Sequence, residues 1–237
     1  ETIDWQRTQP VEKVEWKSPA SLPGRAGVVS IRWKNGLRAV PEMQDLYRAF
    51  REAGFDVWVV SALYQALVEA IADRAGVDPD RVIGVRPLLV DGRYAFGWED
   101  PTSEGDSTTP IAPGAPPIIT YYEGKRAWIE RVVFGARGAA VLARPEGARR
   151  PVLALGDADT DLAMLESASA LAILFDRHQV RVTCRALAEP ERFLVHPVFV
   201  APPAPRTEPY PCSTHRDALG PVLGRDGGPI ADQPAPR

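Results

Sequence analysis

The sequence predicts an α/β domain built on a parallel sheet. Short apolar runs of strand length alternate with stretches in which apolar residues recur at the three- and four-residue spacing of a helix. The runs at 152–155 and 171–175 are apolar throughout, as is typical of strands that a parallel sheet buries on both faces. A chain of 237 residues is long enough for one such domain with a full core, alone or with a small accessory region.

The first half of the predicted domain contains a helix, a strand, a second helix and a hairpin. The first helix begins at Pro41 and ends before Gly54, because proline suits a first helical position and glycine a helix end. A buried strand at 55–60 leads directly into the second helix. A strand at 81–85 precedes a hairpin over 86–97, where the Asp-Gly turn is a strong hairpin signal.

The second half begins with a long loop and then returns to alternating helices and strands. Residues 99–117 are rich in Pro, Gly, Ser and Thr, and we expect this loop to be mobile. A helix opens at Glu123, and the apolar strands at 152–155 and 171–175 follow it. The segment 180–187 is ambiguous between strand and helix.

We expect three regions along the chain. Residues 1–27 are polar, with little periodicity, and resemble the end of a larger structure. Residues 28–200 hold the α/β core. From residue 201 to residue 237 the chain is rich in proline and polar residues, and Gly220 to Arg237 are predicted to be a disordered tail.

Composition limits the classes of partner. A net charge of −3 and a pI near 5.7 give no basic surface for nucleic acid. No apolar stretch approaches the roughly 18 residues that a membrane helix needs. We therefore expect a small-molecule partner, and the oligomeric state stays open. Cys184 and Cys212 lack metal-ligand spacing and are either two isolated thiols or one disulfide, which would indicate an oxidising compartment.

Carboxylates gather at the end of the strand 152–155. Gly156 lets the backbone leave the strand, and Asp157, Asp159 and Asp161 follow within five residues. Ligands of open α/β sheets bind outside the carboxyl ends of the strands, and oxygen ligands of this kind suit Mg²⁺. The alternative is that these residues only cap a helix and complement its dipole.

Two further polar residues stand where a strand gives way to a helix. Ser61 follows the strand 55–60, where its hydroxyl and the first free N–H groups of a helix can bind an anion. A serine there is also an ordinary N-cap. Lys125 lies in the first turn of a helix, where a cation is disfavoured unless an anion is near.

The order and local contexts of these residues resemble the second, third and fourth motifs of the haloacid dehalogenase superfamily of phosphohydrolases. The contexts are Val-Val-Ser at Ser61, Gly-Lys at Lys125, and Leu-Gly-Asp-x-x-x-Asp at Asp157 and Asp161. The spacing, with a hairpin between the first two motifs, is most similar to the phosphoserine-phosphatase-type branch. Three segments also resemble secreted bacterial phosphatases close to phosphorylcholine phosphatase: Asp56-Val-Trp-Val-Val-Ser61, Arg81-Val-Ile-Gly-Val85 and Pro209-Tyr-Pro-Cys-Ser213.

The resemblance implies a Rossmann-like three-layer core and a Mg²⁺-dependent hydrolase of phosphate monoesters that works through an aspartyl-phosphate. Ser61 and Lys125 would bind the phosphoryl group, Asp157 would ligate Mg²⁺, and Asp161 would lie in or beside the metal shell. The substrate would be a small phosphorylated metabolite, and the likeness to secreted enzymes favours a periplasmic or secreted location. Thr160 stands where phosphoserine phosphatases often carry Asn, so the alcohol part of the substrate stays open.

The family's nucleophile motif, Asp-x-Asp-x-Thr at the end of a central first strand, does not occur in the sequence. In one interpretation that strand and its nucleophile lie outside this chain, residues 1–27 are the remnant of a helical cap, and the chain alone is inactive. In another, Val28 to Trp33 is a degenerate first strand, and the protein is a dead phosphate- or metal-binding module. We favour the first, because the other motifs have little reason to persist around a dead centre. A receiver-like doubly wound domain is a third interpretation, and it predicts no long hairpin before Lys125.

Overall fold

The computed structural model describes residues 11–17, 28–34, 40–144, 147 and 149–235. The chain forms two compact units, residues 1–45 and 46–237. In the first, β1 (Val11–Lys17) pairs antiparallel with β2 (Val28–Lys34), and β2 pairs with no other described strand. The interpretation of 28–33 as the first strand of the core sheet is therefore wrong. The assignment of residues 1–27 to a cap stays a prediction, and most of that range lies outside the described residues.

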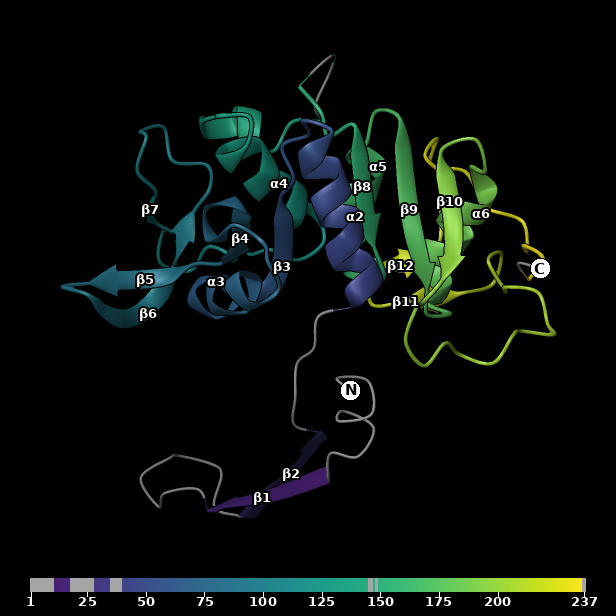
Figure 1. Ribbon diagram of the computed structural model, residues 1–237, viewed down its shortest axis with the longest axis horizontal. Coiled ribbons are helices and arrows are strands. Elements are labelled where there is room, and N and C mark those ends of the chain that lie inside the picture. The colour runs from purple at the N-terminus through teal and green to yellow at the C-terminus, as the bar shows by residue number, and fades with distance from the viewer. Residues whose placement is uncertain (1–10, 18–27, 35–39, 145–146, 148, 236–237) are drawn as a thin grey trace. The chain divides into compact units, whose positions relative to one another are not determined.

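The second unit is built from parallel strands and helices, which confirms the predicted α/β class. Two strands, β3 (Val59–Tyr64) and β4 (Val82–Val85), pair in parallel. Three more form a parallel sheet in the order β10-β9-β8, which Figure 1 shows in green. These strands are β8 (Leu153–Gly156), β9 (Leu171–Asp176) and β10 (Phe193–Pro197).

Five α-helices are described. They are α2 (Pro41–Glu52), α3 (Gln65–Arg74), α4 (Glu123–Val132), α5 (Leu162–Ser167) and α6 (Val180–Ala188). Three short 3₁₀ segments accompany them: η1 (Pro79–Arg81), η2 (Gly138–Val141) and η3 (Asp159–Asp161). Among the described residues, no helix combines the length and the apolar character that a membrane crossing requires.

The predicted hairpin is present and longer than expected. β5 (Pro87–Val90) pairs with β6 (Arg93–Asp100), and β7 (Thr109–Pro110) adds a third antiparallel strand. Asp91 and Gly92 have φ of 51° and 72°, as the two central residues of a type I′ turn require. Figure 1 shows this hairpin extending away from the other elements of the second unit.

The strand predicted at 55–60 begins later, at Val59. Before it, the Asp56 carboxylate accepts hydrogen bonds from the Trp58 indole at 2.9 Å and from Arg81 Nε at 2.7 Å, which hold this stretch outside the sheet. After it, the Gln65 side chain accepts from the Gly84 N–H at 2.6 Å and delays the start of α3. As a result, Ser61 lies within β3 and is not the N-cap of the helix.

Helix α4 packs against both groups of parallel strands. One cluster of buried apolar residues contains Ile83 of β4, Trp128 of α4, Ala154 of β8 and Leu174 of β9. The Trp128 indole N–H donates to the Ile118 carbonyl at 2.7 Å, so the polar atom of this large ring is satisfied. The two groups of strands therefore share one core, although no hydrogen-bonded ladder joins them in the described part of the chain.

A buried arginine anchors part of the loop 99–117. The Arg131 guanidinium, on α4, donates to the carbonyl oxygens of Ser103 at 2.5 Å, Gly105 at 2.6 Å and Asp106 at 3.0 Å. These carbonyls have no helix or strand partner, so the charged donor satisfies them. Residues 103–106 are thus tied to the core, and the mobility of the remaining loop stays a prediction.

The C-terminal segment is folded onto the second unit, so the prediction of a disordered tail is wrong for residues 220–235. Tyr210, Cys212, Val222 and Ile230 are buried in a small core with Cys184 of α6. Cys184 and Cys212 form a disulfide, which decides between the two alternatives left open by the sequence. Packing and a covalent link outweigh the proline-rich composition.

Charged side chains of α6 also hold this segment. Arg181 binds both carboxylate oxygens of Asp217, at 2.6 and 2.8 Å, and this pairing lowers the pKa of Asp217 to about 2. Arg185 donates to the Leu223 carbonyl at 3.0 Å. Bidentate contacts of this kind fix orientation as well as distance, so they orient the segment on α6.

Glu130 on α4 provides a first test of the core. Its side chain is buried, and Oε1 has no hydrogen-bond partner in the described residues. Burial raises the pKa of this carboxyl above 4.5, so the free energy of unfolding falls as pH rises from 4.5 through the folded pKa. We expect Glu130→Gln to raise the free energy of unfolding at pH 7 by about 1 kcal/mol, because it removes the cost of a buried charge.

Urea unfolding at pH 4 and pH 7 measures this effect, with Glu191→Gln, an exposed glutamate, as the control. Ionisation of Glu130 should lower the free energy of unfolding of the wild type between pH 4 and pH 7. The Glu130→Gln variant should lack this contribution. A loss of stability in Glu130→Gln at pH 7 would contradict the conclusion that the charge of this buried carboxylate destabilises the fold.

Candidate functional site

A buried ion pair between Lys125 and Asp161 forms the centre of the candidate site. Lys125 Nζ lies 2.6 Å from Asp161 Oδ1, and each side chain is 7 % exposed. Nζ also donates to the Val60 carbonyl oxygen at 3.4 Å. One ammonium group thus connects β3 to the loop after β8, two segments that no ladder joins among the described strands.

The start of α4 fixes the position of Lys125. A Cβ on Gly124 would lie 1.7 Å from the Ile119 carbonyl oxygen, so a larger residue does not fit there. Tyr122 has φ of 48°, and its N–H donates to the Thr160 carbonyl at 3.0 Å. This contact holds the first turn of α4 beside the acidic loop, and Asp161 supplies the anion that a lysine in a first turn requires.

The second oxygen of Asp161 organises the loop after β8. Asp161 Oδ2 accepts hydrogen bonds from the backbone N–H groups of Asp157 at 2.9 Å and Ala158 at 3.1 Å. A Cβ on Gly156 would lie 2.7 Å from the Asp161 Cβ, so the close approach of the carboxylate depends on glycine. Both oxygens of Asp161 are therefore engaged by protein donors.

Ser61 lies next to the residue that Lys125 contacts. Its carbonyl oxygen accepts a hydrogen bond from the Thr120 hydroxyl at 2.6 Å, and Thr120 is fully buried. Its own hydroxyl oxygen accepts from the Leu63 N–H at 3.2 Å. The Ser61 hydroxyl retains its proton for donation to a ligand. The structure thus brings the backbone of Ser61 and the Lys125–Asp161 pair into one region.

Asp157 points to a different partner. Its Oδ2 lies 2.8 Å from a terminal nitrogen of Arg177, which follows β9, and the two side chains are 43 % and 59 % exposed. The backbone of Asp157 therefore belongs to the Lys125–Asp161 network, whereas its carboxylate faces solvent and a second cation. The sequence predicted a carboxylate at this strand end but gave no indication of the arginine beside it.

Asp159, the third acid of the loop, has a structural role. Its Oδ1 accepts from the Val182 N–H in the first turn of α6 at 2.8 Å, and its own N–H donates to Gln179 Oε1, also at 2.8 Å. A side chain from another segment thus satisfies a helix-start donor. This contact helps to explain why the ambiguous segment 180–187 forms a helix.

The hydrogen-bond and ion-pair partners of Asp157 and Asp161 determine whether these carboxylates could hold a metal ion. The described residues contain no group of three or more His, Cys, Asp or Glu side chains placed to hold one. The oxygens of Asp161 already have three protein donors, which leaves this carboxylate little capacity to ligate a cation. Mg²⁺ usually keeps several waters and takes one or two carboxylates. Asp157 can supply one of these, and a second ligand would have to come from elsewhere.

Two side chains of this region were not predicted from the sequence. Thr120 lies before α4 in no recognisable motif, and it is identified only by its contact with Ser61. Arg177 could have been found by examining every residue that follows a strand of the parallel sheet, since ligand-contacting groups gather at those ends. The sequence motifs mark single segments, whereas these partners come from neighbouring ones.

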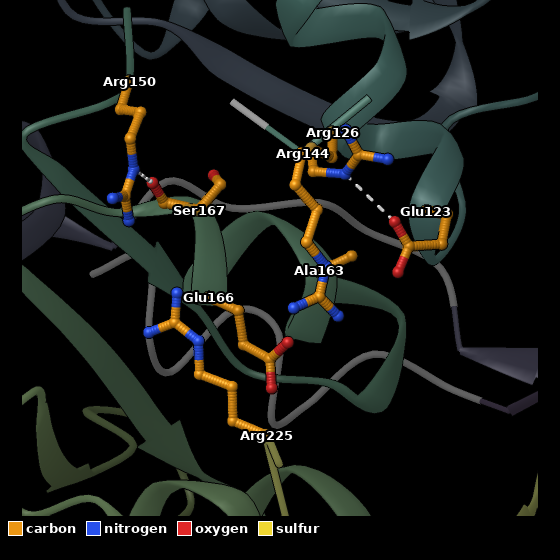
Figure 2. A pocket seen from close by; sticks show the side chains of 8 residues that line it. All are labelled: Glu123, Arg126, Arg144, Arg150, Ala163, Glu166, Ser167 and Arg225. Atoms are coloured by element: carbon orange, nitrogen blue, oxygen red, sulfur yellow. Dashed lines mark hydrogen bonds and ion pairs between the residues drawn. The ribbon is translucent and has the colours of Figure 1, made fainter. Parts of the chain in front are cut away.

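A pocket lined by residues of α4, α5 and neighbouring segments is separate from this site. Figure 2 shows its lining, which contains four arginines and two glutamates and none of the predicted site residues: Glu123, Arg126, Arg144, Arg150, Ala163, Glu166, Ser167 and Arg225. Arg126 is paired with Glu123 and with the carbonyls of Leu142 and Ala143. Arg150 donates to the Ser167 and Ala168 carbonyls at 3.0 and 2.9 Å. These two arginines therefore tie adjacent segments together.

A crystal structure of a conserved protein of unknown function from Anaerococcus prevotii DSM 20548 is similar to this chain. The TM-score is 0.53 and the sequence identity is 25 % over 78 % of this chain. The match covers 44 % of the other protein, so this chain spans less than half of its length. No family model and no curated protein matches the sequence. The similarity is consistent with the α/β class.

Proposed function

We propose that this protein is a Mg²⁺-dependent hydrolase of phosphate monoesters, of the haloacid dehalogenase type. The observation that carries the proposal is the buried Lys125–Asp161 pair beside Ser61, at one end of the parallel strands. A lysine in this position can neutralise phosphoryl oxygens, and Asp161 holds it in place. Phosphoryl transfer depends largely on positioning and on charge neutralisation of this kind. The substrate would be a small phosphorylated metabolite.

In this proposal Ser61 donates its hydroxyl proton to a phosphoryl oxygen, and Lys125 compensates the negative charge. Asp157 is the residue of this chain that would hold Mg²⁺, which when bound would neutralise further phosphate charge. Asp161 acts as a positioning residue, since its oxygens bind Lys125 and the loop backbone. The location would be periplasmic or secreted, and the Cys184–Cys212 disulfide supports an oxidising compartment.

The nucleophile would be an aspartate outside these 237 residues. β3 pairs only with β4, and β8 pairs only with β9, so each has one edge without a strand partner in the described residues. Lys125 bridges the ends of these two strands. A further parallel strand between them would carry an aspartate to the same place, and its carboxylate could attack phosphorus as the ester oxygen leaves.

The proposal is tested with p-nitrophenyl phosphate and the native polypeptide, including residues beyond this chain. Hydrolysis should require Mg²⁺, stop on addition of EDTA and resume when Mg²⁺ is restored. Asp157→Asn should lower the rate by at least about tenfold, because it weakens the cation site. Asp91→Asn is the matched control, since it makes the same chemical change at an exposed turn where asparagine accepts the positive φ. Absence of Mg²⁺-dependent hydrolysis across phosphate monoesters would overturn the proposal.

The second candidate is a phosphate- or metal-binding module without catalysis. The Arg177–Asp157 pair favours it, because a guanidinium already balances the carboxylate that would hold the cation. This candidate predicts that the native polypeptide binds inorganic phosphate and hydrolyses no ester. A receiver-like domain is disfavoured, since the β5–β6 hairpin stands between Ser61 and Lys125.

A further inference from the structure

The ion pair between Arg177 and Asp157 has a consequence for cation binding. We propose that Arg177 is a built-in counter-ion that occupies the Asp157 carboxylate and lowers the affinity of the site for a divalent cation. This inference rests on the proposed function, in which Asp157 holds Mg²⁺. It concerns a specificity-determining residue that no sequence motif identified.

The topology of the sheet brings the two charges together. β8 and β9 are parallel neighbours, with Gly156 opposite Leu174, so their carboxyl ends lie side by side. Asp157 is the first residue after β8, and Arg177 is the first residue after β9. The guanidinium reaches across to Asp157 Oδ2 at 2.8 Å. The pair is therefore a contact between adjacent strand ends, at the edge where the cation would bind.

The backbone beside Arg177 is held by a buried carboxylate. Asp176 is 8 % exposed and accepts hydrogen bonds from the His178 N–H at 2.8 Å, the Thr183 hydroxyl at 3.1 Å and the Tyr210 hydroxyl at 2.8 Å. His178 has φ of 61°, which turns the chain sharply after the strand. Because α6 and the C-terminal segment both bind Asp176, the backbone from which the Arg177 side chain extends is held in place.

Asp157 is the acid of this loop whose carboxylate is balanced by an exposed cation. Asp159 binds the start of α6, and Asp161 binds Lys125 and two backbone N–H groups. A divalent cation that bound the Asp157 carboxylate would meet the positive charge of Arg177 on Oδ2. Exposed ion pairs are weak, so displacing this one changes the affinity by a small factor, about two- to fivefold.

The experiment is a calorimetric titration of Mg²⁺ alone into the native protein and its Arg177→Gln variant. Arg177→Gln should bind Mg²⁺ about two- to fivefold more tightly than the wild type, and binding should disappear when Asp157→Asn is added. Arg137→Gln is the control, because it removes a half-buried arginine from another ion pair, with the exposed Asp106, and should leave Mg²⁺ affinity unchanged. Mg²⁺ binding by Arg177→Gln when the wild type shows none would also support the inference.

Two other outcomes separate the inference from the proposed function. Equal Mg²⁺ affinity in wild type and Arg177→Gln would overturn the role of Arg177 and leave the phosphatase proposal intact. Absence of Mg²⁺ binding in wild type, Arg177→Gln and Arg137→Gln alike would overturn the metal role of Asp157, and with it both proposals. Thermal unfolding of each variant without Mg²⁺ establishes that the compared proteins are folded.

Discussion

Lys125→Met in the native polypeptide is expected to lower the rate of phosphate-monoester hydrolysis by about a hundredfold or more. The Lys125 ammonium is buried between Asp161 and the Val60 carbonyl, so the variant lacks the positive charge that would neutralise phosphoryl oxygens there. The same change should lower the free energy of unfolding by about 3–5 kcal/mol, because it leaves the Asp161 carboxylate buried without its partner. Methionine has nearly the volume of lysine, so the variant removes the positive charge without leaving a cavity.

A double variant separates catalysis from folding. Lys125→Met with Asp161→Asn removes both charges, and the asparagine oxygen can still accept from the Asp157 and Ala158 N–H groups. Stability should return most of the way towards the wild type, since replacing both partners of a buried pair is often close to neutral. The hydrolysis rate should stay low. Recovery of the rate in the double variant would contradict the assignment of Lys125 as a phosphoryl-binding residue.

Removal of the Cys184–Cys212 disulfide is expected to lower the free energy of unfolding by about 3–4 kcal/mol. The bridge closes a loop with a sequence separation of 28, and both sulfur atoms lie in the small core formed by α6 and the C-terminal segment. Cys184→Ala with Cys212→Ala, compared with the oxidised and the reduced wild type in urea, measures the effect. The reduced wild type is the control, because it has the same side-chain volume without the bond.

Loss of the bridge should also loosen Asp176, since Tyr210 is two residues from Cys212 and donates to this carboxylate. Burial and the Asp176 contact raise the pKa of the Tyr210 hydroxyl, which donates its proton to this carboxylate. Amide hydrogen exchange at 176–178 should accelerate in the double alanine variant. Uptake of a thiol reagent by the folded, unreduced wild type would show that the bridge is not formed.

Local sequence patterns were sufficient to predict the helices, strands and turns that are decided by residues close together in the chain. The helix from Pro41, the Asp91-Gly92 hairpin, the helix at Glu123 and the strands near 152 and 171 follow from periodicity and turn chemistry. Sequence patterns also indicated Ser61, Lys125 and Asp161 as polar residues near strand ends and helix starts. The structure places Ser61 within β3, and the role of the three residues as one site stays a prediction.

The sequence by itself therefore determined the α/β class, and its candidate site residues stay predictions. The tertiary structure decided their partners: Asp161 binds Lys125, Asp159 caps α6, and Asp157 faces Arg177. It also decided that residues 220–235 are ordered, through a disulfide and buried side chains of distant segments. The physical reason is that a carboxylate or a thiol specifies which bonds it can form, whereas the group that comes within bonding distance depends on how distant segments pack.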